Sequence, residues 1–492
     1  MEFVGRADEL AGLEAELEQL RRGDRGRFAW IRGRRRVGKS RLVQEFCDRS
    51  ESRYCFFQAS KRPRAEAVAE FEEAVRESSL RAAEDFAGAS HSSWPAALRA
   101  AARGATTADP AIIVLDELPY LLEEDEGFSA DLQRAWDREL EGAPVLLICI
   151  GSDVRMMDAL VGERSPLHGR PTREMRIAPL DPGAVAQITG AADAAGAFDR
   201  YLIVGGFPLL AAMWPEGAGL REFLEETLRD DQSPIATTAL RIIASEFEQE
   251  LKATEVLRAI GHGETSYSRI QSRSGVKGNT LTGALDVLVE TKGLVAKQLP
   301  YAVPRAKSTA RYTVIDPYLR FWLRFVGPHM AELSRGRPDL VVGRILRDWS
   351  AYRGRAIEPL VREALERLLV DSDWSERLGG ARHVESWWRR DHSVEVDLVG
   401  GDRPDDPRRI GFLGSIKWHE SAPFTAADAT ALVRDAALVP GAGAGPGETG
   451  ERSPGTGGAL RPKLIAVSRS GFDPADLSVD AALGPEDLLA AW

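Results

Sequence analysis

The chain has 492 residues, and with 64 Lys and Arg against 75 Asp and Glu its formal net charge is −11. That charge excludes a uniformly basic nucleic-acid binder, although a local basic patch can persist within it. The composition is 43% hydrophobic and 28% charged, and no apolar run approaches the roughly 20 residues that span a bilayer. We therefore expect a globular cytoplasmic protein of about three domains with no membrane partner.

The N-terminus, MEFVGRADEL, lacks the charged and apolar regions of a signal peptide, which also favours the cytoplasm. The three cysteines, Cys47, Cys55 and Cys149, lie in apolar stretches without the spacing of metal ligands. We expect them to be reduced thiols in the core. An acidic helix is expected over Leu10–Arg22.

The loop GRRRVGKS fits the phosphate-binding pattern G-x-x-x-x-G-K-[ST] at every constrained position. An apolar strand, RFAWIRG, precedes it and an amphipathic helix, SRLVQEFCDRS, follows it, so the positive end of the helix faces the phosphates. The alternative is a basic surface turn in an Arg-rich sequence, and the strand before the loop and the helix after it favour the phosphate-binding interpretation. We expect ATP and Mg²⁺ as ligands, and the nucleotide to contact Gly33, Arg34, Arg35, Arg36, Val37, Gly38, Lys39, Ser40 and Arg41.

The run AIIVLDE over Ala111–Glu117 is apolar and ends in two carboxylates, as a central parallel strand does at its carboxyl edge. Asp116 would bind Mg²⁺ together with Ser40, while Glu117 would polarise the attacking water. Lys39 would reach the β and γ phosphates. A buried strand followed by a solvated acidic turn is the alternative, and the following LEEDEG fits it, but the phosphate-binding loop favours catalysis.

Five apolar stretches, RFAWIRG, RYCFFQAS, AIIVLDE, VLLICIGS and REMRIAPL, alternate with helical stretches. This alternation predicts an α/β fold with a parallel sheet covered on both faces. From Leu180 to the end of this first region, at about Pro234, only helices are expected. We therefore place a P-loop ATPase core at 1–180 and a helical lid at 181–245.

The next region, Leu251–Val326, has 12 Lys and Arg against 5 acids, a balance of +7. Three helical stretches and a basic hairpin follow one another there, which is the order of a winged helix-turn-helix; we assign it to 246–326. Contacts with double-stranded DNA would come from Lys277, Asn279, Thr280, Arg305, Lys307 and Arg311. Protein contacts, or basic residues that are merely solvated, are the alternative.

The last region, 327–492, reads as helix, strand, strand, helix and strand. GRAIEPLVREALERLL places Glu358 on a helix, and WWRRDHSVEVDLVG alternates as one strand that puts Glu395 and Asp397 on one face. RRIGFLGSIKW is the next strand and ends near Lys417. The Gly- and Pro-rich stretch at about 440–462 is expected to be a flexible insertion.

These motifs together resemble the archaeal-type ATPases of the AAA and STAND group of P-loop proteins. In that group an FVGR box lines the adenine pocket, which implies base contacts from Val4, Gly5 and Arg6. The strand after the acidic pair carries a polar sensor near the γ-phosphate, a place that Ser152 occupies. IDPYLRFWLRFV resembles the segment that follows the winged helix in the family.

The resemblance implies two further nucleotide contacts. SPLHGRPTREMRIAPL resembles a family segment whose arginine, here Arg170, would act on transition-state charge in its own site or a neighbour's; an ordinary salt bridge is an equal alternative. GGFP resembles a lid turn that contacts nucleotide through Pro208, although a helix C-cap would look the same.

The C-terminal region resembles the PD-(D/E)XK nuclease fold of the same family. Glu358, Asp397 and Lys417 match its site, but Ser415 stands where the family has an acid. A hydroxyl in place of a carboxylate weakens Mg²⁺ binding, unless Glu395 supplies the missing charge. We expect a nuclease-like domain in which cleavage is less favoured than a structural or DNA-gripping role.

Three functions follow from the sequence. The first is an ATPase that couples nucleotide state to DNA engagement. The second is a STAND-like signalling switch that binds a protein partner or self-associates. The third is an ATP-gated, Mg²⁺-dependent DNA nuclease.

Overall fold

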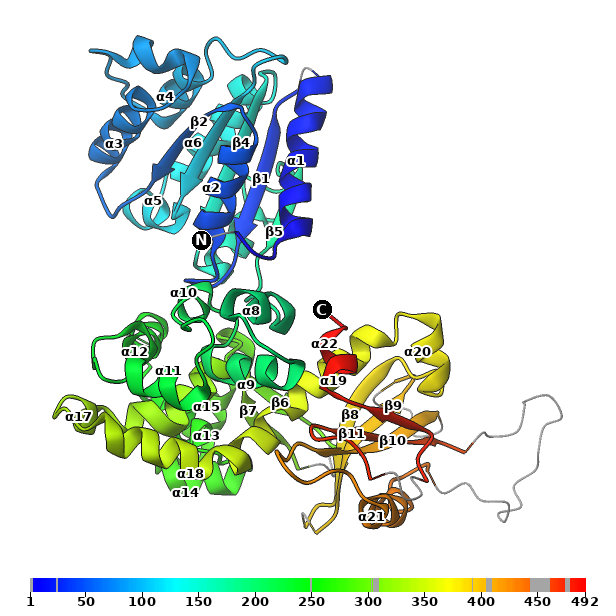
Figure 1. The fold of residues 1–492 in the computed structure, drawn as a ribbon. Helices are drawn as coiled ribbons and strands as arrows, with labels where there is room; N and C mark the ends of the chain where they lie inside the picture. Colours follow the sequence, from blue (N-terminus) through cyan, green and yellow to red (C-terminus); the bar gives the residue numbers. More distant parts are fainter. Residues whose placement is uncertain are drawn as a thin grey trace. The chain divides into compact units, whose positions relative to one another are not determined.

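The computed structural model describes residues 3–23, 25–247, 250–301, 303, 309–391, 393–403, 409–442, 461–473 and 478–492. Arg305, Lys307 and most of the expected insertion lie outside this described part. The chain folds into two compact units, Met1–Leu180 and Asp181–Trp492, which are drawn in Figure 1. None of the helices in the described residues combines the length and the apolarity that a membrane crossing requires.

The first unit is built on a parallel five-stranded sheet with the strand order β2-β3-β4-β1-β5. Its two central strands are buried along their whole length, as their apolar sequences predict. Each β1 residue pairs in register with β4, from Arg27 opposite Leu146 to Arg32 opposite Gly151. The strands are β1 (Arg27–Arg32), β2 (Arg53–Gln58), β3 (Ala111–Asp116), β4 (Val145–Gly151) and β5 (Arg173–Arg176).

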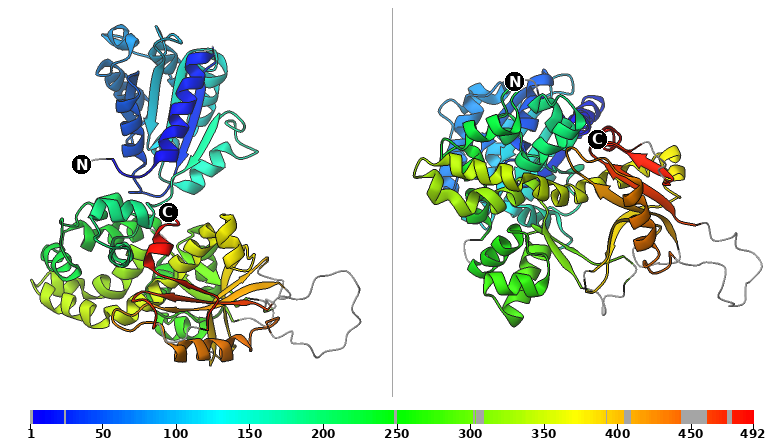
Figure 2. Two further views of the ribbon diagram at one scale, coloured as in Figure 1. Left: turned by 45° about the vertical axis from the view of Figure 1, so that its right-hand side comes forward. Right: turned by 60° about the horizontal axis from the view of Figure 1, so that its bottom comes forward.

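Helices cover both faces of this sheet (Figures 1 and 2). Alternate residues of β1 separate two cores, because Phe28 packs with one set of helices and Ile31 with the other. The described helices of this unit are α1 (Ala7–Arg22), α2 (Lys39–Arg49), α3 (Arg64–Arg76), η1 (Arg81–Phe86), α4 (Trp94–Ala101), α5 (Leu118–Glu124), α6 (Phe128–Ala135), η2 (Trp136–Leu140) and α7 (Val154–Val161).

The three cysteines are free thiols buried in this unit, as expected. Burial raises the pKa of the Cys47 and Cys55 thiols to about 12. Thiols protonated at neutral pH are poor nucleophiles, so all the chemistry of this unit has to come from other side chains.

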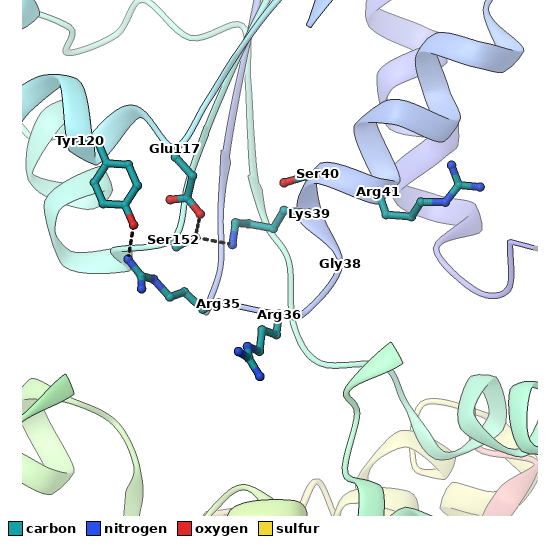
Figure 3. Close-up of a pocket in the computed structure, with 9 residues that line it drawn as sticks. All are labelled: Arg35, Arg36, Gly38, Lys39, Ser40, Arg41, Glu117, Tyr120 and Ser152. Carbon is teal, nitrogen blue, oxygen red and sulfur yellow. Dashed lines mark hydrogen bonds between the residues drawn. The ribbon is translucent and has the colours of Figure 1, made fainter. Parts of the chain in front are cut away.

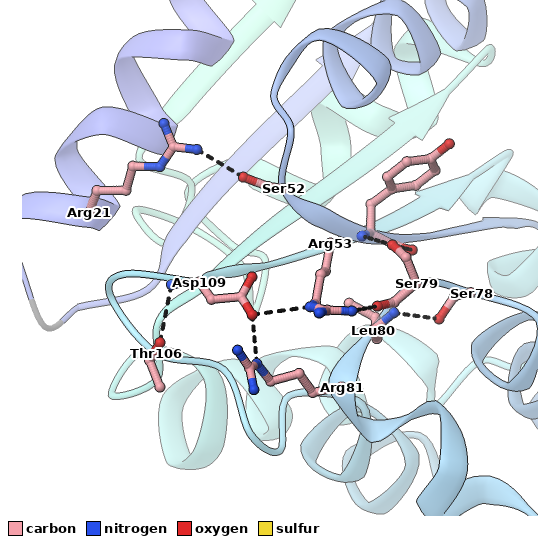
Figure 4. Close-up of polar contacts among 10 residues, drawn as sticks. Arg21, Ser52, Arg53, Ser78, Ser79, Leu80, Arg81, Thr106 and Asp109 are labelled. Carbon is pink, nitrogen blue, oxygen red and sulfur yellow. Dashed lines mark hydrogen bonds and ion pairs between the residues drawn. The ribbon is translucent and has the colours of Figure 1, made fainter.

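Ion pairs close the amino edge of the sheet, where β2 and β3 begin (Figure 4). Asp109, just before β3, accepts from Nε of Arg53 at 3.1 Å and from Nε of Arg81 at 2.6 Å. Arg53 also donates to the Ser79 carbonyl at 3.0 Å. Two arginines thus share one carboxylate at this edge, and the ion pairs tie the start of β3 to β2 and to η1.

The second unit begins with helices, as expected after Leu180. Gly205 has a φ of 58° and follows the last turn of α9, where its N–H donates to the Tyr201 carbonyl. That geometry is a helix C-cap, which glycine makes without steric cost. The helices are α8 (Pro182–Thr189), α9 (Ala194–Val204), α10 (Pro208–Ala211), α11 (Leu220–Thr227) and α12 (Pro234–Glu246).

Three helices and an antiparallel pair of strands come next. The two strands pair from Val295 opposite Val314 to Gln298 opposite Arg311. Ser266, between the first two helices, adds an isolated antiparallel bridge to Arg311. The elements are α13 (Leu251–Gly261), α14 (Tyr267–Ser274), α15 (Gly278–Asp286), η3 (Val287–Thr291), β6 (Val295–Gln298) and β7 (Arg311–Val314).

Short and long helices then lead to a mixed sheet with the order β12-β11-β10-β9-β8. The pairs β8–β9 and β9–β10 are antiparallel, and β10–β11 and β11–β12 are parallel. The elements are α16 (Pro317–Phe321), η5 (Trp322–Val326), η6 (Gly327–His329), α17 (Met330–Leu333), α18 (Pro338–Ala356), α19 (Glu358–Leu368), α20 (Ser372–Arg377), β8 (His383–Trp388), β9 (Glu395–Gly401), β10 (Ile410–Lys417), α21 (Ala426–Ala436), β11 (Lys463–Ser468), β12 (Ala481–Leu483) and α22 (Pro485–Leu489).

The prediction of one strand over WWRRDHSVEVDLVG is wrong. The segment is a hairpin, because β8 ends at Trp388 and β9 begins at Glu395. The carboxylate of Asp391 accepts from the backbone N–H and from the hydroxyl of Ser393, at 3.0 and 2.6 Å. An aspartate that bonds the backbone two residues later makes a local turn, and this turn interrupts the strand.

Within the second unit, α9 is bonded to residues far along the chain. Asp199 accepts from Arg353 of α18 and from Arg469, which follows β11, both at 2.9 Å. Next to it, Phe198 packs edge-on against Trp418 and Trp492. Arg353 is only 1% exposed, so its charge depends on its carboxylate partners, which are Asp199 and, at 3.6 Å, Glu420.

Candidate nucleotide-binding site

The loop between β1 and α2 adopts a conformation that its glycines make possible. Gly38 immediately precedes α2 with a φ of 94°, in the region that favours glycine. A Cβ at Gly33 would collide with the carbonyl oxygen of Ile177. The loop therefore delivers the N-terminus of α2, where backbone N–H groups lack helical partners, to the carboxyl edge of the sheet.

A cavity of about 290 Å³ lies at this loop (Figure 3). Its lining carries four cationic side chains and a single carboxylate. This balance favours an anionic ligand with several negative charges. The lining residues are Arg35, Arg36, Gly38, Lys39, Ser40, Arg41, Glu117, Tyr120 and Ser152.

Lys39 lies at the centre of the site and is 5% exposed. Its Nζ donates to the Arg34 carbonyl at 3.0 Å and to the Ser152 hydroxyl at 3.1 Å. Burial lowers the pKa of Lys39, and the nearby carboxylates of Glu117 and Asp116 oppose that shift. Both bonds are to neutral oxygens, and a phosphate oxygen would be a stronger acceptor for the ammonium group.

The side chains of Ser40 and Asp116 bring two oxygen-bearing groups together. Asp116 ends β3 and is 1% exposed, and its Oδ2 accepts from the Ser40 hydroxyl at 2.6 Å. Burial raises the pKa of Asp116, so a cation at this carboxylate would be favoured. Among the described residues, no group of three or more His, Cys, Asp and Glu could hold a metal. The pair suits Mg²⁺, which proteins commonly hold through one carboxylate together with substrate phosphates.

Glu117 is placed by its backbone and by a neighbouring strand. Its φ is 54°, a left-handed conformation that is uncommon for a residue with a Cβ and occurs often at functional sites. Its Oε1 accepts from the Ser152 hydroxyl at 2.7 Å. Ser152 follows β4, and β4 pairs with β3, so the parallel sheet brings the two side chains together.

The FVGR box lies against the loop. Gly5 and Arg6 both have positive φ values, 74° and 66°. The guanidinium of Arg6 donates to the carbonyl oxygens of Val37, at 3.1 Å, and Ala178. Through these bonds Arg6 links the phosphate-binding loop to the segment that follows β5. Contacts of Val4, Gly5 and Arg6 with a base remain a prediction.

Arg170 is not brought to the cavity. Its Nε and Nη2 donate to the two carboxylate oxygens of Asp137, at 2.7 and 2.9 Å, and it lies outside the lining residues. Pro208 is the first residue of α10 in the second unit, and its contact with nucleotide also remains a prediction.

Tyr120 also lines the cavity, although the sequence motifs did not predict it. Its hydroxyl accepts from Nη2 of Arg35 at 2.7 Å, and its ring lies 5.9 Å from the guanidinium carbon. Tyr120 is three residues after Glu117, in the first turn of α5. A polar aromatic residue three positions after Glu117 was the available indication, because α5 starts at the same sheet edge.

Only some of the residues expected to contact DNA are exposed to solvent. Lys277, Asn279 and Thr280 are exposed at the start of α15. Arg311, by contrast, forms an ion pair with Glu395 and lies 4.2 Å above the Trp388 ring. Arg305 and Lys307 lie outside the described residues. The start of α15 is therefore the part of the predicted surface that the structure describes as accessible.

The residues expected to form a nuclease-like site have protein partners. Asp397 accepts from the Ile416 N–H at 2.8 Å and from the Ser415 hydroxyl at 3.1 Å. Lys417 forms an ion pair with Asp428 at 3.0 Å. The pairing of Glu395 with Arg311 removes the proposed substitute charge.

Glu358 completes that group. The nearest cation, Nη1 of Arg362, is 3.8 Å from its carboxylate and also donates to the Asp397 carbonyl at 3.3 Å. Burial raises the pKa of Glu358 to about 7, and the charge of Asp397 adds to that effect. The guanidinium of Arg362 therefore lies beside two residues of this group, Glu358 and Asp397.

Two stretches of the chain match known protein families. Residues 3–191 match an ATPase domain found predominantly in Archaea, and residues 322–431 match a family of archaeal and bacterial proteins of unknown function. An uncharacterized protein of Methanocaldococcus jannaschii is 24% identical over 424 residues, which cover 85% of this chain and 88% of that protein.

Two solved structures are similar to this chain with lower sequence identity. The Walker-type ATPase of Pyrococcus abyssi is 18% identical with a TM-score of 0.46, covering 65% of this chain and 96% of its own. The ORC2 protein of Aeropyrum pernix is 14% identical with a TM-score of 0.44, covering 70% of this chain and 96% of its own.

Proposed function

We propose that this chain, whose residues 3–191 form an ATPase domain of the kind found predominantly in Archaea, binds ATP with Mg²⁺ and hydrolyses it. One observation carries the proposal. A phosphate-binding loop, a hydroxyl–carboxylate pair and a second carboxylate held by a serine all meet at one 290 Å³ cavity. Phosphoryl transfer depends mainly on positioning and charge neutralisation, and these groups provide both.

Each group has a role that follows from its place. Lys39 exchanges its two neutral acceptors for the β and γ phosphates. Ser40 and Asp116 would hold Mg²⁺, which would neutralise charge on the phosphate oxygens. Glu117 accepts the proton of the attacking water, and the Ser152 hydroxyl fixes the orientation of its carboxylate at 2.7 Å.

We propose further that residues 246–326 are a winged helix that binds double-stranded DNA. The order of three helices and an antiparallel hairpin supports this, as does the balance of +7 over Leu251–Val326. Contacts from Lys277, Asn279 and Thr280 at the exposed start of α15 would be mainly to phosphates. Arg311 contributes less, because Glu395 already pairs with it.

We propose that the C-terminal domain grips DNA or supports the winged helix and does not cut. Ser415 replaces an acid, Lys417 is paired with Asp428, and Glu395 is paired with Arg311. A metal-dependent nuclease needs free oxygen ligands and a water near the phosphodiester, and these pairings oppose both.

The test is ATP hydrolysis by the wild type and by Glu117→Gln, with and without duplex DNA in Mg²⁺, followed by a gel of the same DNA. We expect Glu117→Gln to bind ATP but to hydrolyse it about 10²-fold or more slowly, and DNA to stimulate the wild type while staying intact. Normal turnover by Glu117→Gln would contradict its role.

The DNA arm separates the alternatives. Affinity that falls with salt, and falls again in Lys277→Ala, supports DNA engagement, because each lost phosphate contact lowers the log–log salt slope by about 0.9. Cut strands would instead indicate an active nuclease. If DNA neither binds nor changes the rate, a signalling switch with a protein partner becomes the better proposal.

A further inference from the structure

Hydrolysis at this cavity calls for a cation at the terminal phosphate in addition to Lys39, because charge spreads over its oxygens in the transition state. Arg170, the arginine expected to supply it, has both ends of its guanidinium on Asp137. Three arginines line the cavity itself, Arg35, Arg36 and Arg41. The arginine that meets the terminal phosphate should be the one whose side chain extends toward Glu117, where water would be activated.

Two of the three are directed elsewhere. Arg41 lies on α2 across the cavity from Glu117 (Figure 3) and pairs with Glu45 at 2.8 Å. The Arg36 side chain points away from Glu117 in the same view. Arg35 alone among them extends toward α5, the helix that begins directly after Glu117, and bonds to Tyr120 there.

Arg35 also shares its surroundings with Lys39. The positive charge of Arg35 is one of the influences that lower the pKa of Lys39, after burial. Two cations that repel each other across a cavity gain more from a polyanion between them than either would alone. The contact with Tyr120 uses one of the five N–H donors of a guanidinium and is solvent-exposed, so it is a weak restraint.

We propose that Arg35 is the arginine that binds the terminal phosphate of ATP, and that Tyr120 holds its guanidinium at the edge of the cavity until the nucleotide arrives. This inference rests on the proposed function. In the reaction the water oxygen bonds to the γ-phosphorus, the bond from that phosphorus to the β–γ bridging oxygen breaks, and Glu117 takes a water proton. Arg35 donates N–H groups to the γ-phosphoryl oxygens throughout.

A consequence is that each chain carries a complete site. Because Arg35 belongs to the phosphate-binding loop itself, no arginine from a second copy is required. The rate per molecule is then independent of protein concentration.

The binding test uses a Glu117→Gln background, so that ATP persists. We expect Arg35→Ala to weaken ATP binding by about tenfold or more, as loss of charged hydrogen bonds does, and to change ADP affinity by less than about threefold. Arg35→Lys should restore part of the ATP affinity, because it keeps the charge.

Tyr120→Phe should raise ATP affinity by up to about threefold, since it releases Arg35. Equal losses for ATP and ADP in Arg35→Ala would overturn the inference.

The kinetic test uses the native Glu117. Arg35→Ala should lower kcat by about 10³-fold, while Arg138→Ala, an exposed arginine outside the cavity, should leave it unchanged. Mixing Arg35→Ala with Lys39→Ala should not restore activity; recovery would place Arg35 in a neighbour's site and overturn the inference. A wild type that binds ATP without hydrolysing it would contradict the proposed function, while the comparison of ATP with ADP would still decide the role of Arg35.

Discussion

Two regions of this molecule carry the residue types that bind divalent metal and phosphate, the cavity around Lys39 and the group formed by Glu358, Asp397 and Lys417. At the cavity, four cations and one carboxylate face an open volume. At the C-terminal group, Lys417 has Asp428 and Asp397 has two donors from β10. The difference teaches that a motif predicts a site where its lysine bonds to neutral oxygens that a ligand can replace, as Lys39 does, and not where a carboxylate already pairs with the lysine, as at Lys417.

The largest expected effect is at the cavity. Lys39→Ala should weaken ATP binding by about 100-fold or more, because two phosphates lose a charged donor. The fold should survive, since Lys39 bonds only to Arg34 and Ser152 oxygens that water can satisfy. Calorimetric titration with ATP measures the affinity, and circular dichroism checks the fold. An ATP affinity equal to that of the wild type would mean that Lys39 does not bind the phosphates, and the cavity would then no longer differ from the C-terminal group in its use of charge.

The second prediction reverses the contrast at the C-terminal group. Ser415→Asp would place a carboxylate near the Oδ2 atom of Asp397, where the serine hydroxyl now lies at 3.1 Å. Repulsion between two acids should cost about 1–3 kcal/mol of unfolding free energy, and Mg²⁺ should restore part of it. The wild type should show no such Mg²⁺ effect.

Thermal unfolding with and without Mg²⁺, in the absence of nucleotide, makes that comparison. Ser415→Ala is the matched control, because it removes the hydroxyl without adding charge. Stabilisation of the wild-type second unit by Mg²⁺ would contradict our account of this group as one already neutralised by protein.

The third prediction concerns pH. Glu358 has a pKa of about 7, raised from its ordinary value of 4.5 by burial, so the folded state holds a proton that the unfolded state has lost between these values. The stability that this group contributes is therefore present below about pH 4.5 and is lost as the pH rises through about 7. We expect a loss of about 1–2 kcal/mol, reduced by the partial exposure of the side chain.

Denaturant unfolding of wild type and Glu358→Gln from pH 5 to 8 measures this. The amide keeps the neutral shape, so the variant should show a flatter pH dependence, and the difference between the two should grow toward high pH. Parallel curves would mean that the proton resides elsewhere.

The smallest effect is expected at Arg170. Arg170→Ala removes a partly exposed ion pair with Asp137, which should cost less than about 1 kcal/mol of unfolding free energy. Its ATP hydrolysis should stay within about twofold of the wild type, in contrast to Arg35→Ala. A loss comparable with that of Arg35→Ala would return Arg170 to the site, through a second copy.

Much of the first unit could be predicted from its sequence, because local patterns determine it. Apolar runs such as AIIVLD become fully buried strands, and the loop motif fixes Lys39 and Ser40. The match of Ser152 to a sensor position led to a residue that bonds Glu117. Glu117 and Ser152 follow the adjacent strands β3 and β4, so for this pair the order of a parallel sheet was enough.

The remaining features depend on partners distant in sequence. Nothing near Arg311 indicates that it pairs with Glu395, 84 residues later. Asp428, which neutralises Lys417, lies on a different element, α21. The turn at Asp391 was available in the sequence, but the alternation of β9 was extended back across it to the tryptophans of β8. Alternation identifies a face and does not identify where a strand stops.

The ion pairs of Asp199 bear on how the second unit is synthesised. Asp199 and its partner Arg469 are 270 residues apart, and Phe198 contacts Trp492. Helix α9 emerges from the ribosome early, yet the arginines that pair with Asp199 follow it by 154 and 270 residues. Closing so long a loop costs entropy before its contacts form, which slows folding. The nascent chain must therefore keep α9 incomplete through most of translation, a period in which a chaperone would have its best opportunity to bind.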